Sequence, residues 1–178
     1  MQFKKNLFAV TLFTIASLTA VSANAIDVSK QFDVKIEITS VCTVDATIGT
    51  NDVDFGQVVA GTAATAEAAT PLTVSCSKNT PYVVNLTPSN ANAQGLGEMT
   101  GPGAGTTVVP YQLRKAAGES AAVWGNQGNL TTAGNGIAGT GQGVTTPINH
   151  IVYATTTAAA TDVEPGTYKD TVTVKVTY

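Results

Sequence analysis

The sequence predicts an all-β fold, a sandwich or barrel of short strands. Apolar and polar residues alternate along several runs, and Gly and Pro turn signals such as Gly101-Pro102-Gly103 and Pro165-Gly166 separate these runs. Alternation gives a segment one apolar face, which is the pattern of a strand with one side in the core. Abundant β-branched residues and a mean hydropathy of +0.15 argue against a disordered chain. Short alternating strands in one domain-sized chain therefore favour a β-sandwich or barrel.

The first alternating run spans Ile26 to Ile38 and is interrupted on its apolar face only by Lys30. Such a run is long enough to follow the edge of a sheet. The Ala-rich stretch from Ala60 to Ala69 lacks the apolar stripe of a helix, so we expect a loop or an edge strand there. The apolar face of the first run carries Ile26, Val28, Phe32, Val34, Ile36 and Ile38.

Five later runs show the same period of two, and two Gly-rich stretches, Gly95 to Gly105 and Gly125 to Gly143, are expected to form long loops. Neither Gly-rich stretch leads into a helical pattern, so neither predicts a phosphate-binding loop. The later runs carry Leu72, Val74 and Cys76; Tyr82, Val84 and Leu86; Tyr111 and Leu113; Ile148, Ile151, Val152 and Tyr153; and Tyr168, Val172, Val174, Val176 and Tyr178.

The N-terminus has the organisation of an export signal. Lys4 and Lys5 precede a mostly apolar stretch from Leu7 to Val21, which is too short to span a membrane. Ala23-Asn24-Ala25 has the small residues of a cleavage site. We therefore expect residues 1–25 to be a signal peptide that is removed. The alternative is an uncleaved anchor, but no stop-transfer pattern follows Ala25, and we expect no stable membrane insertion.

Two cysteines remain in the exported chain, Cys42 and Cys76. Because exported proteins meet an oxidising environment, the sequence predicts a disulfide between them. Closing a loop of this length stabilises a fold by roughly 3–4 kcal/mol in the chain-entropy model. The alternative is a reactive or metal-binding thiol pair, which the wide spacing and the absence of a nearby His or Lys disfavour.

Composition and motifs argue against several classes of function. Nine basic against twelve acidic side chains provide no basic face for nucleic acid. One His, His150, and two Cys are a poor ligand supply for a transition metal, so we expect no metal and no cofactor. There is no GxSxG motif, and Asp162 and Glu164 flank a turn where solvated acids are ordinary. The sequence therefore predicts a protein that is not an enzyme.

The two ends of the chain leave two explanations open. In one, both terminal runs pair within their own sandwich. In the other, the N-terminal run leaves its domain and completes the sheet of a neighbour by β-strand addition. Burying five of its apolar side chains would contribute on the order of 5–10 kcal/mol before ordering costs. The final run reaches Tyr178, the last residue, which suggests that the end of this strand is held in place by a contact.

Several segments resemble the spore coat protein U domain family, which includes subunits of archaic chaperone–usher pili. The C-terminal run from Pro165 to Tyr178 looks like the terminal signature of that family. Shorter matches occur, in the family's order, across the predicted mature chain. They are Val41-Cys42-Thr43-Val44, Asp54-Phe55-Gly56, Leu72-Thr73-Val74-Ser75-Cys76, Tyr111-Gln112-Leu113 and Val123-Trp124-Gly125.

This resemblance implies an incomplete immunoglobulin-like β-sandwich that lacks its last strand and is completed by donor-strand exchange. It divides the chain into a signal peptide (1–25), an N-terminal donor segment (26–36) and a pilin domain (37–178). The donor residues would be Ile26, Val28, Phe32, Val34 and Ile36. Val172, Val174, Val176 and Tyr178 would line the acceptor groove, and the Tyr178 carboxylate would meet a basic cleft of a chaperone.

The function implied is that of a structural pilin subunit serving surface attachment and biofilm formation. Its partners would be a periplasmic chaperone, an outer-membrane usher and other pilin subunits, in a homo- or hetero-polymer. It would pass through the periplasm to a fimbrium on the cell surface. The alternatives are a self-complete secreted β-sandwich, either spore-coat-like or binding a ligand such as a sugar through its loops, and a single-domain tip adhesin.

Overall fold

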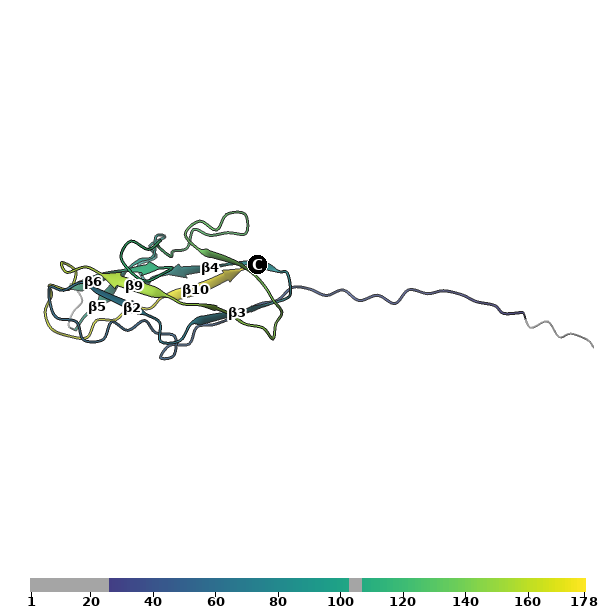
Figure 1. Ribbon diagram of the computed structural model, residues 1–178, viewed down its shortest axis with the longest axis horizontal. Coiled ribbons are helices and arrows are strands. Elements are labelled where there is room, and N and C mark those ends of the chain that lie inside the picture. Colours follow the sequence, from purple (N-terminus) through teal and green to yellow (C-terminus); the bar gives the residue numbers. More distant parts are fainter. Residues whose placement is uncertain (1–25, 103–106) are drawn as a thin grey trace, which may run out of the picture. The chain divides into compact units, whose positions relative to one another are not determined.

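The computed structural model describes residues 26–102 and 107–178, so the predicted signal peptide lies outside the described residues. The chain divides into a first unit that ends at Glu37 and a second unit from Ile38 to Tyr178. Residues 26–41 belong to no helix or strand (Figure 1), and each apolar side chain of the alternating run is at least 82% exposed. The alternation of this run is therefore not used for pairing within a sandwich of its own chain.

The described part of the second unit contains ten strands in three antiparallel sheets, and no helix. Apart from β5 and β6, strands that pair within a sheet are not consecutive in sequence, so the chain crosses between sheets. The first sheet holds β1 (Cys42–Asp45), β3 (Leu72–Cys76) and β8 (Ile148–His150); the second holds β10 (Thr173–Thr177), β4 (Pro81–Thr87) and β7 (Ile137–Thr140); the third holds β2 (Ala64–Glu67), β9 (Tyr153–Thr156), β6 (Val108–Arg114) and β5 (Leu96–Thr100).

The first two sheets follow the strand order of an immunoglobulin-like sandwich. In that fold, strands A, B and E share one sheet, and strand F lies between strands C and G in the other. Here β1, β3 and β8 take the places of A, B and E, while β4 and β10 take those of C and F. Strand β10 stands at the edge of its sheet, paired only with β4. None of the described residues forms the strand that would follow at the place of G.

One hydrophobic core joins the three sheets. Trp124 belongs to this core and is completely buried, and its indole Nε1 donates a hydrogen bond to the backbone oxygen of Val84 at 3.0 Å. Gly95 lies beside it with φ +74°, and a Cβ there would overlap the backbone carbonyl of Trp124. The other large, fully buried side chains are Tyr82, Leu86, Leu113, Val74, Val84 and Cys76. All six come from the alternating runs on β3, β4 and β6.

The two Gly-rich stretches are not loops throughout, which corrects the prediction from the sequence. Strand β5 lies within the first stretch and β7 within the second. A Cβ at Gly97 would overlap the ring of Tyr111, and one at Gly139 would overlap the ring of Tyr82. These glycines are therefore strand positions on which a cross-strand aromatic ring lies.

Two other expectations had mixed outcomes. The Ala-rich stretch contains β2, an edge strand of the third sheet, so the expectation of a loop or edge strand is confirmed. The run from Ile148 to Tyr153 was expected to be one strand. Instead it is split into β8 and β9, which belong to different sheets.

Candidate functional site

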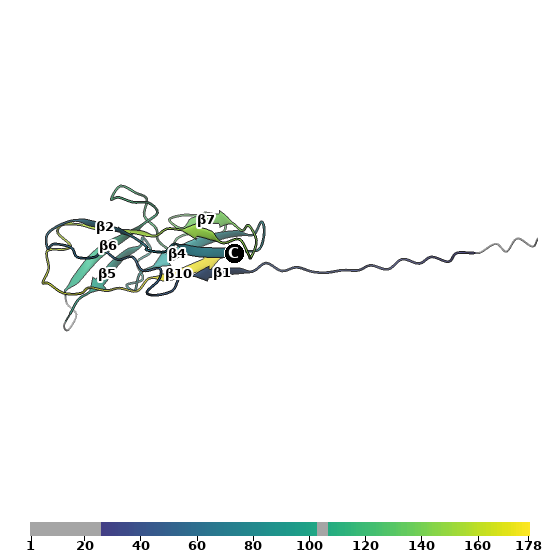
Figure 2. The ribbon, with the colours of Figure 1, turned by 60° about the horizontal axis from the view of Figure 1, so that its bottom comes forward.

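The edge strands β1 and β10 lie beside each other without pairing (Figure 2). Their core-facing side chains remain partly exposed. We call this region the open edge and define it by Val44 of β1 together with Val172, Val174, Val176 and Tyr178 of the last run. The valines of the last run pack against the core cluster, yet all three are only half-buried. The open edge is thus a part of the core that is incompletely covered.

Strand register shows that these side chains face the core. Residues opposite each other in an antiparallel pair point to the same face. Val174 lies opposite Leu86 and Val176 opposite Val84, and both partners are at most 1% exposed. In the other sheet Val44, which is 37% exposed, lies opposite the fully buried Val74. The exposure therefore arises because none of the residues that the structure describes pairs with the outer side of β1 or β10.

The β1 side of the open edge is fixed to the domain. Cys42 and Cys76 form the predicted disulfide, which joins β1 to β3 at directly opposite positions. Just before β1, the backbone N–H of Val41 donates to Ser77 Oγ at 3.0 Å. The backbone N–H of Ser77 in turn donates to the oxygen of Val41 at 2.9 Å. The edge of β1 therefore keeps its position while its outer side stays open.

The residues expected to line an acceptor groove are brought together along one edge. Val44 was not expected there, although its spacing of two from Cys42 was a usable signal. The residues expected to act as a donor lie in the first unit, where they are exposed on a segment without secondary structure. Ile38 continues their apolar face and is equally exposed, but it begins the second unit.

Two partly buried hydrogen bonds involve titratable side chains near the core. The Tyr111 hydroxyl donates to Asp170 Oδ2 at 2.7 Å. Burial, followed by this bond to a carboxylate, raises the pKa of Tyr111 far above its ordinary value, so the hydroxyl stays protonated. His150 Nε2 lies 3.0 Å from the Tyr82 hydroxyl, and burial lowers the pKa of His150. His150 also contacts the Trp124 ring edge-on, which is the environment of a packed core residue.

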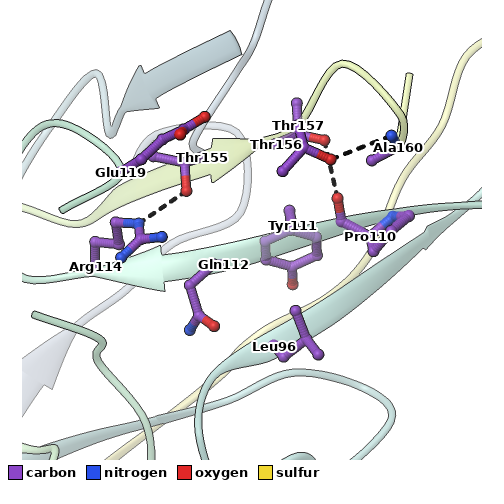
Figure 3. A pocket seen from close by; sticks show the side chains of 10 residues that line it. All are labelled: Leu96, Pro110, Tyr111, Gln112, Arg114, Glu119, Thr155, Thr156, Thr157 and Ala160. Atoms are coloured by element: carbon purple, nitrogen blue, oxygen red, sulfur yellow. Dashed lines mark hydrogen bonds between the residues drawn. The ribbon is translucent and has the colours of Figure 1, made fainter. Parts of the chain in front are cut away.

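A pocket of about 390 Å³ lies on β5, β6 and β9 (Figure 3). Its polar groups are largely engaged with one another. Arg114 Nε donates to the Thr155 hydroxyl at 2.8 Å, and the Thr156 hydroxyl donates to the backbone oxygen of Pro110 at 2.9 Å. Its charged lining consists of Arg114 and Glu119, without a nucleophile–base pair. This pocket offers no arrangement typical of a catalytic site.

Searches of the described chain for two other features gave negative results. Among residues 26–102 and 107–178, no group of three or more His, Cys, Asp or Glu residues is arranged to hold a metal ion. Within the same residues, no helix has the length and apolar character needed to cross a bilayer.

The fold and the open edge define a class: an immunoglobulin-like domain with an incompletely covered core edge and a separate apolar segment. A family model described as the Spore Coat Protein U domain matches residues 28–175, and the chain belongs to this family. No curated protein matches the chain.

One solved structure similar to this chain comes from Acinetobacter baumannii. It is the crystal structure of the CsuC–CsuE chaperone–tip adhesion subunit pre-assembly complex from archaic chaperone–usher Csu pili. The identity is 23% and the TM-score is 0.46, over 79% of this chain and 40% of that chain. The chain therefore spans less than half the length of the chain that it matches.

Proposed function

We propose that this protein is a structural pilin subunit that polymerises by donor-strand complementation. The segment 26–36 of one subunit adds to β10 of the next, so that Ile26, Val28, Phe32, Val34 and Ile36 cover the open edge. The observation that carries this proposal is that one chain contains two incomplete parts that complement each other. The domain leaves Val172, Val174, Val176 and Tyr178 partly uncovered, and the segment exposes an apolar row with no strand partner.

Strand addition would satisfy exposed groups on both the open edge and the segment. The unpaired side of β10 presents backbone N–H and C=O groups that an added strand can bind, which gives affinity and direction. The half-buried valines of the open edge lose their contact with water, as do the apolar side chains of the segment. An exposed apolar edge of this kind also promotes aggregation. A periplasmic chaperone would therefore cover the open edge in transit, and an outer-membrane usher would be the place of exchange.

In this proposal the finished polymer is a fimbrium on the cell surface, in which the subunit serves attachment and biofilm formation without catalysis. Membership of the Spore Coat Protein U domain family supports a structural role. The disulfide of Cys42 and Cys76 suits the oxidising route of export.

Deleting residues 26–36 tests the proposal, because the deletion removes none of the ten strands. The full-length precursor and the deletion variant would each be expressed with their chaperone and usher. We expect the variant to reach the periplasm as a chaperone complex but to form no SDS-resistant ladder of polymers. Replacing Gln31, on the polar face of the segment, by Asp is the matched control and should leave the ladder intact.

Two results would contradict the proposal. One is polymer formation by the deletion variant. The other is a mature chain that, made without a chaperone, is a soluble monomer with residues 26–36 hydrogen-bonded to β10 of the same molecule. The latter result would indicate a self-complete secreted sandwich instead.

A further inference from the structure

The apolar rows of the segment and of the open edge have equal lengths, and each is bounded by a charge. On the segment, four apolar residues follow Lys30 at every second position. On the last run, four apolar residues follow Asp170 in the same way. Asp170 is held by the Tyr111 hydroxyl and so belongs to the fixed domain. The two rows are Phe32, Val34, Ile36 and Ile38, and Val172, Val174, Val176 and Tyr178.

Geometry limits how the rows can meet. A strand in the place of G runs antiparallel to F, as every paired strand does in this domain. The segment can then shift along β10 only in steps of two, because a shift of one residue turns its apolar face outward. Three of these registers place Lys30 opposite Val172, Val174 or Val176, where an unpaired ammonium group would be buried against apolar side chains, which is strongly unfavourable. A fourth register places Lys30 opposite Tyr178 and Ile38 opposite Asp170, so that one apolar side chain of the segment faces a carboxylate instead of the row.

We propose that Lys30 fixes the register of strand addition and marks the end of the inserted segment. This inference rests on the proposed function and moves the donor row from residues 26–36 to residues 32–38. Ile26 and Val28 then lie beyond the open edge, and both boundary charges stay outside the apolar contact. The pairs are Ile38 with Val172, Ile36 with Val174, Val34 with Val176, and Phe32 with Tyr178.

The exposure of Ile38 agrees with this register. Its side chain is 82% exposed in the subunit, so insertion into a neighbour breaks no contact in its own domain. The first residue that the described backbone bonds hold to its own domain is Val41, which pairs with Ser77. Thr39 and Ser40 therefore remain as the connection between the inserted row and the donor's own domain.

A scan of single Asp substitutions in the full-length precursor tests the register, with the chaperone and usher present. We expect Ile38→Asp and Val34→Asp to abolish the SDS-resistant ladder, because each places a carboxylate against the core. Val28→Asp should leave the ladder at the level of the control Gln31→Asp. A ladder that survives Ile38→Asp but is lost with Val28→Asp would overturn the register. Polymer formation by the chain without residues 26–36 would instead overturn the proposed function.

Cross-linking gives a second, direct readout. Facing residues of an antiparallel pair lie close enough for a disulfide. We expect Val34→Cys with Val176→Cys to give a covalent ladder on non-reducing gels, and Val34→Cys with Val172→Cys to give none. Adding Lys30→Val to the second pair should produce a ladder, since the excluded register becomes accessible. Lys35→Val, on the polar face, is the control and should not. A ladder from the second pair without Lys30→Val would overturn the role of Lys30.

Discussion

Replacing Val34 by Ala should weaken the assembled fibre and leave the subunit itself unchanged. Val34 is 88% exposed in the subunit, so its side chain contributes almost nothing to the stability of the free domain. In the fibre the same side chain would be buried against the open edge. Losing two buried methyl groups at about 0.8 kcal/mol each destabilises each interface by about 1.5 kcal/mol. That energy corresponds to roughly a tenfold change in the equilibrium between joined and separated subunits.

The measurement is the guanidinium concentration at which purified fibres release monomers, followed by gel electrophoresis without heating. The Val34→Ala fibre should dissociate at a lower concentration than the wild type. Gln31→Ala is the matched control, because it truncates a neighbouring residue on the opposite face and should dissociate like the wild type. Identical midpoints for Val34→Ala and Gln31→Ala would refute the burial of Val34 between subunits.

Three further predictions concern the domain. Replacing Cys42 and Cys76 together by Ser should lower the free energy of unfolding of the subunit by roughly 3–4 kcal/mol. The measurement is calorimetry on purified fibres without chaperone, and an unchanged melting temperature would contradict this expectation. Because burial lowers the pKa of His150 in the folded state, the unfolded chain binds its proton first, so stability should fall as the pH drops below about 6.5. His150→Gln should remove that part of the pH dependence, and a melting temperature that falls equally in both proteins between pH 7 and 5.5 would exclude His150 as its source. Gly95→Ala should destabilise the domain by more than Gly118→Ala does; both have positive φ, but only the first adds a methyl group against a backbone carbonyl. Equal losses of melting temperature would show that φ alone decides.

Alternation identified strands where both the partner strand and the core belong to the same chain. β3, β4 and β10 lie where the runs predicted them, because their apolar faces are the core faces. The run from Ile26 to Ile38 has an equally regular pattern and belongs to no strand in the subunit. A period of two reports that one face is suited to burial. It does not report which molecule provides the surface against which that face is buried.

The prediction of loops in the Gly-rich stretches was wrong for a different reason. The stretches that contain β5 and β7 were interpreted as loops because they are rich in glycine. Gly97 and Gly139 instead lie in strands and leave space for a tyrosine ring that belongs to a neighbouring strand. The ring at Gly139 comes from β4, which is distant in sequence, and the ring at Gly97 comes from β6, which is the next strand. Both contacts depend on strand register, which the glycine content of a stretch does not report. The open edge itself was only partly predictable, since Val44 became visible through its pairing with Val74.

The bonds between Val41 and Ser77 limit how far apart successive domains of such a fibre can be. Between Ile38, at the end of the inserted row, and Val41 the backbone extends over three residue steps, at most about 11 Å. A fibre built in this way has almost no slack between its units. Its bending and its response to pulling must therefore arise from backbone rotations at Thr39 and Ser40, and lengthening this tether with glycines should make the filament visibly more flexible in electron micrographs.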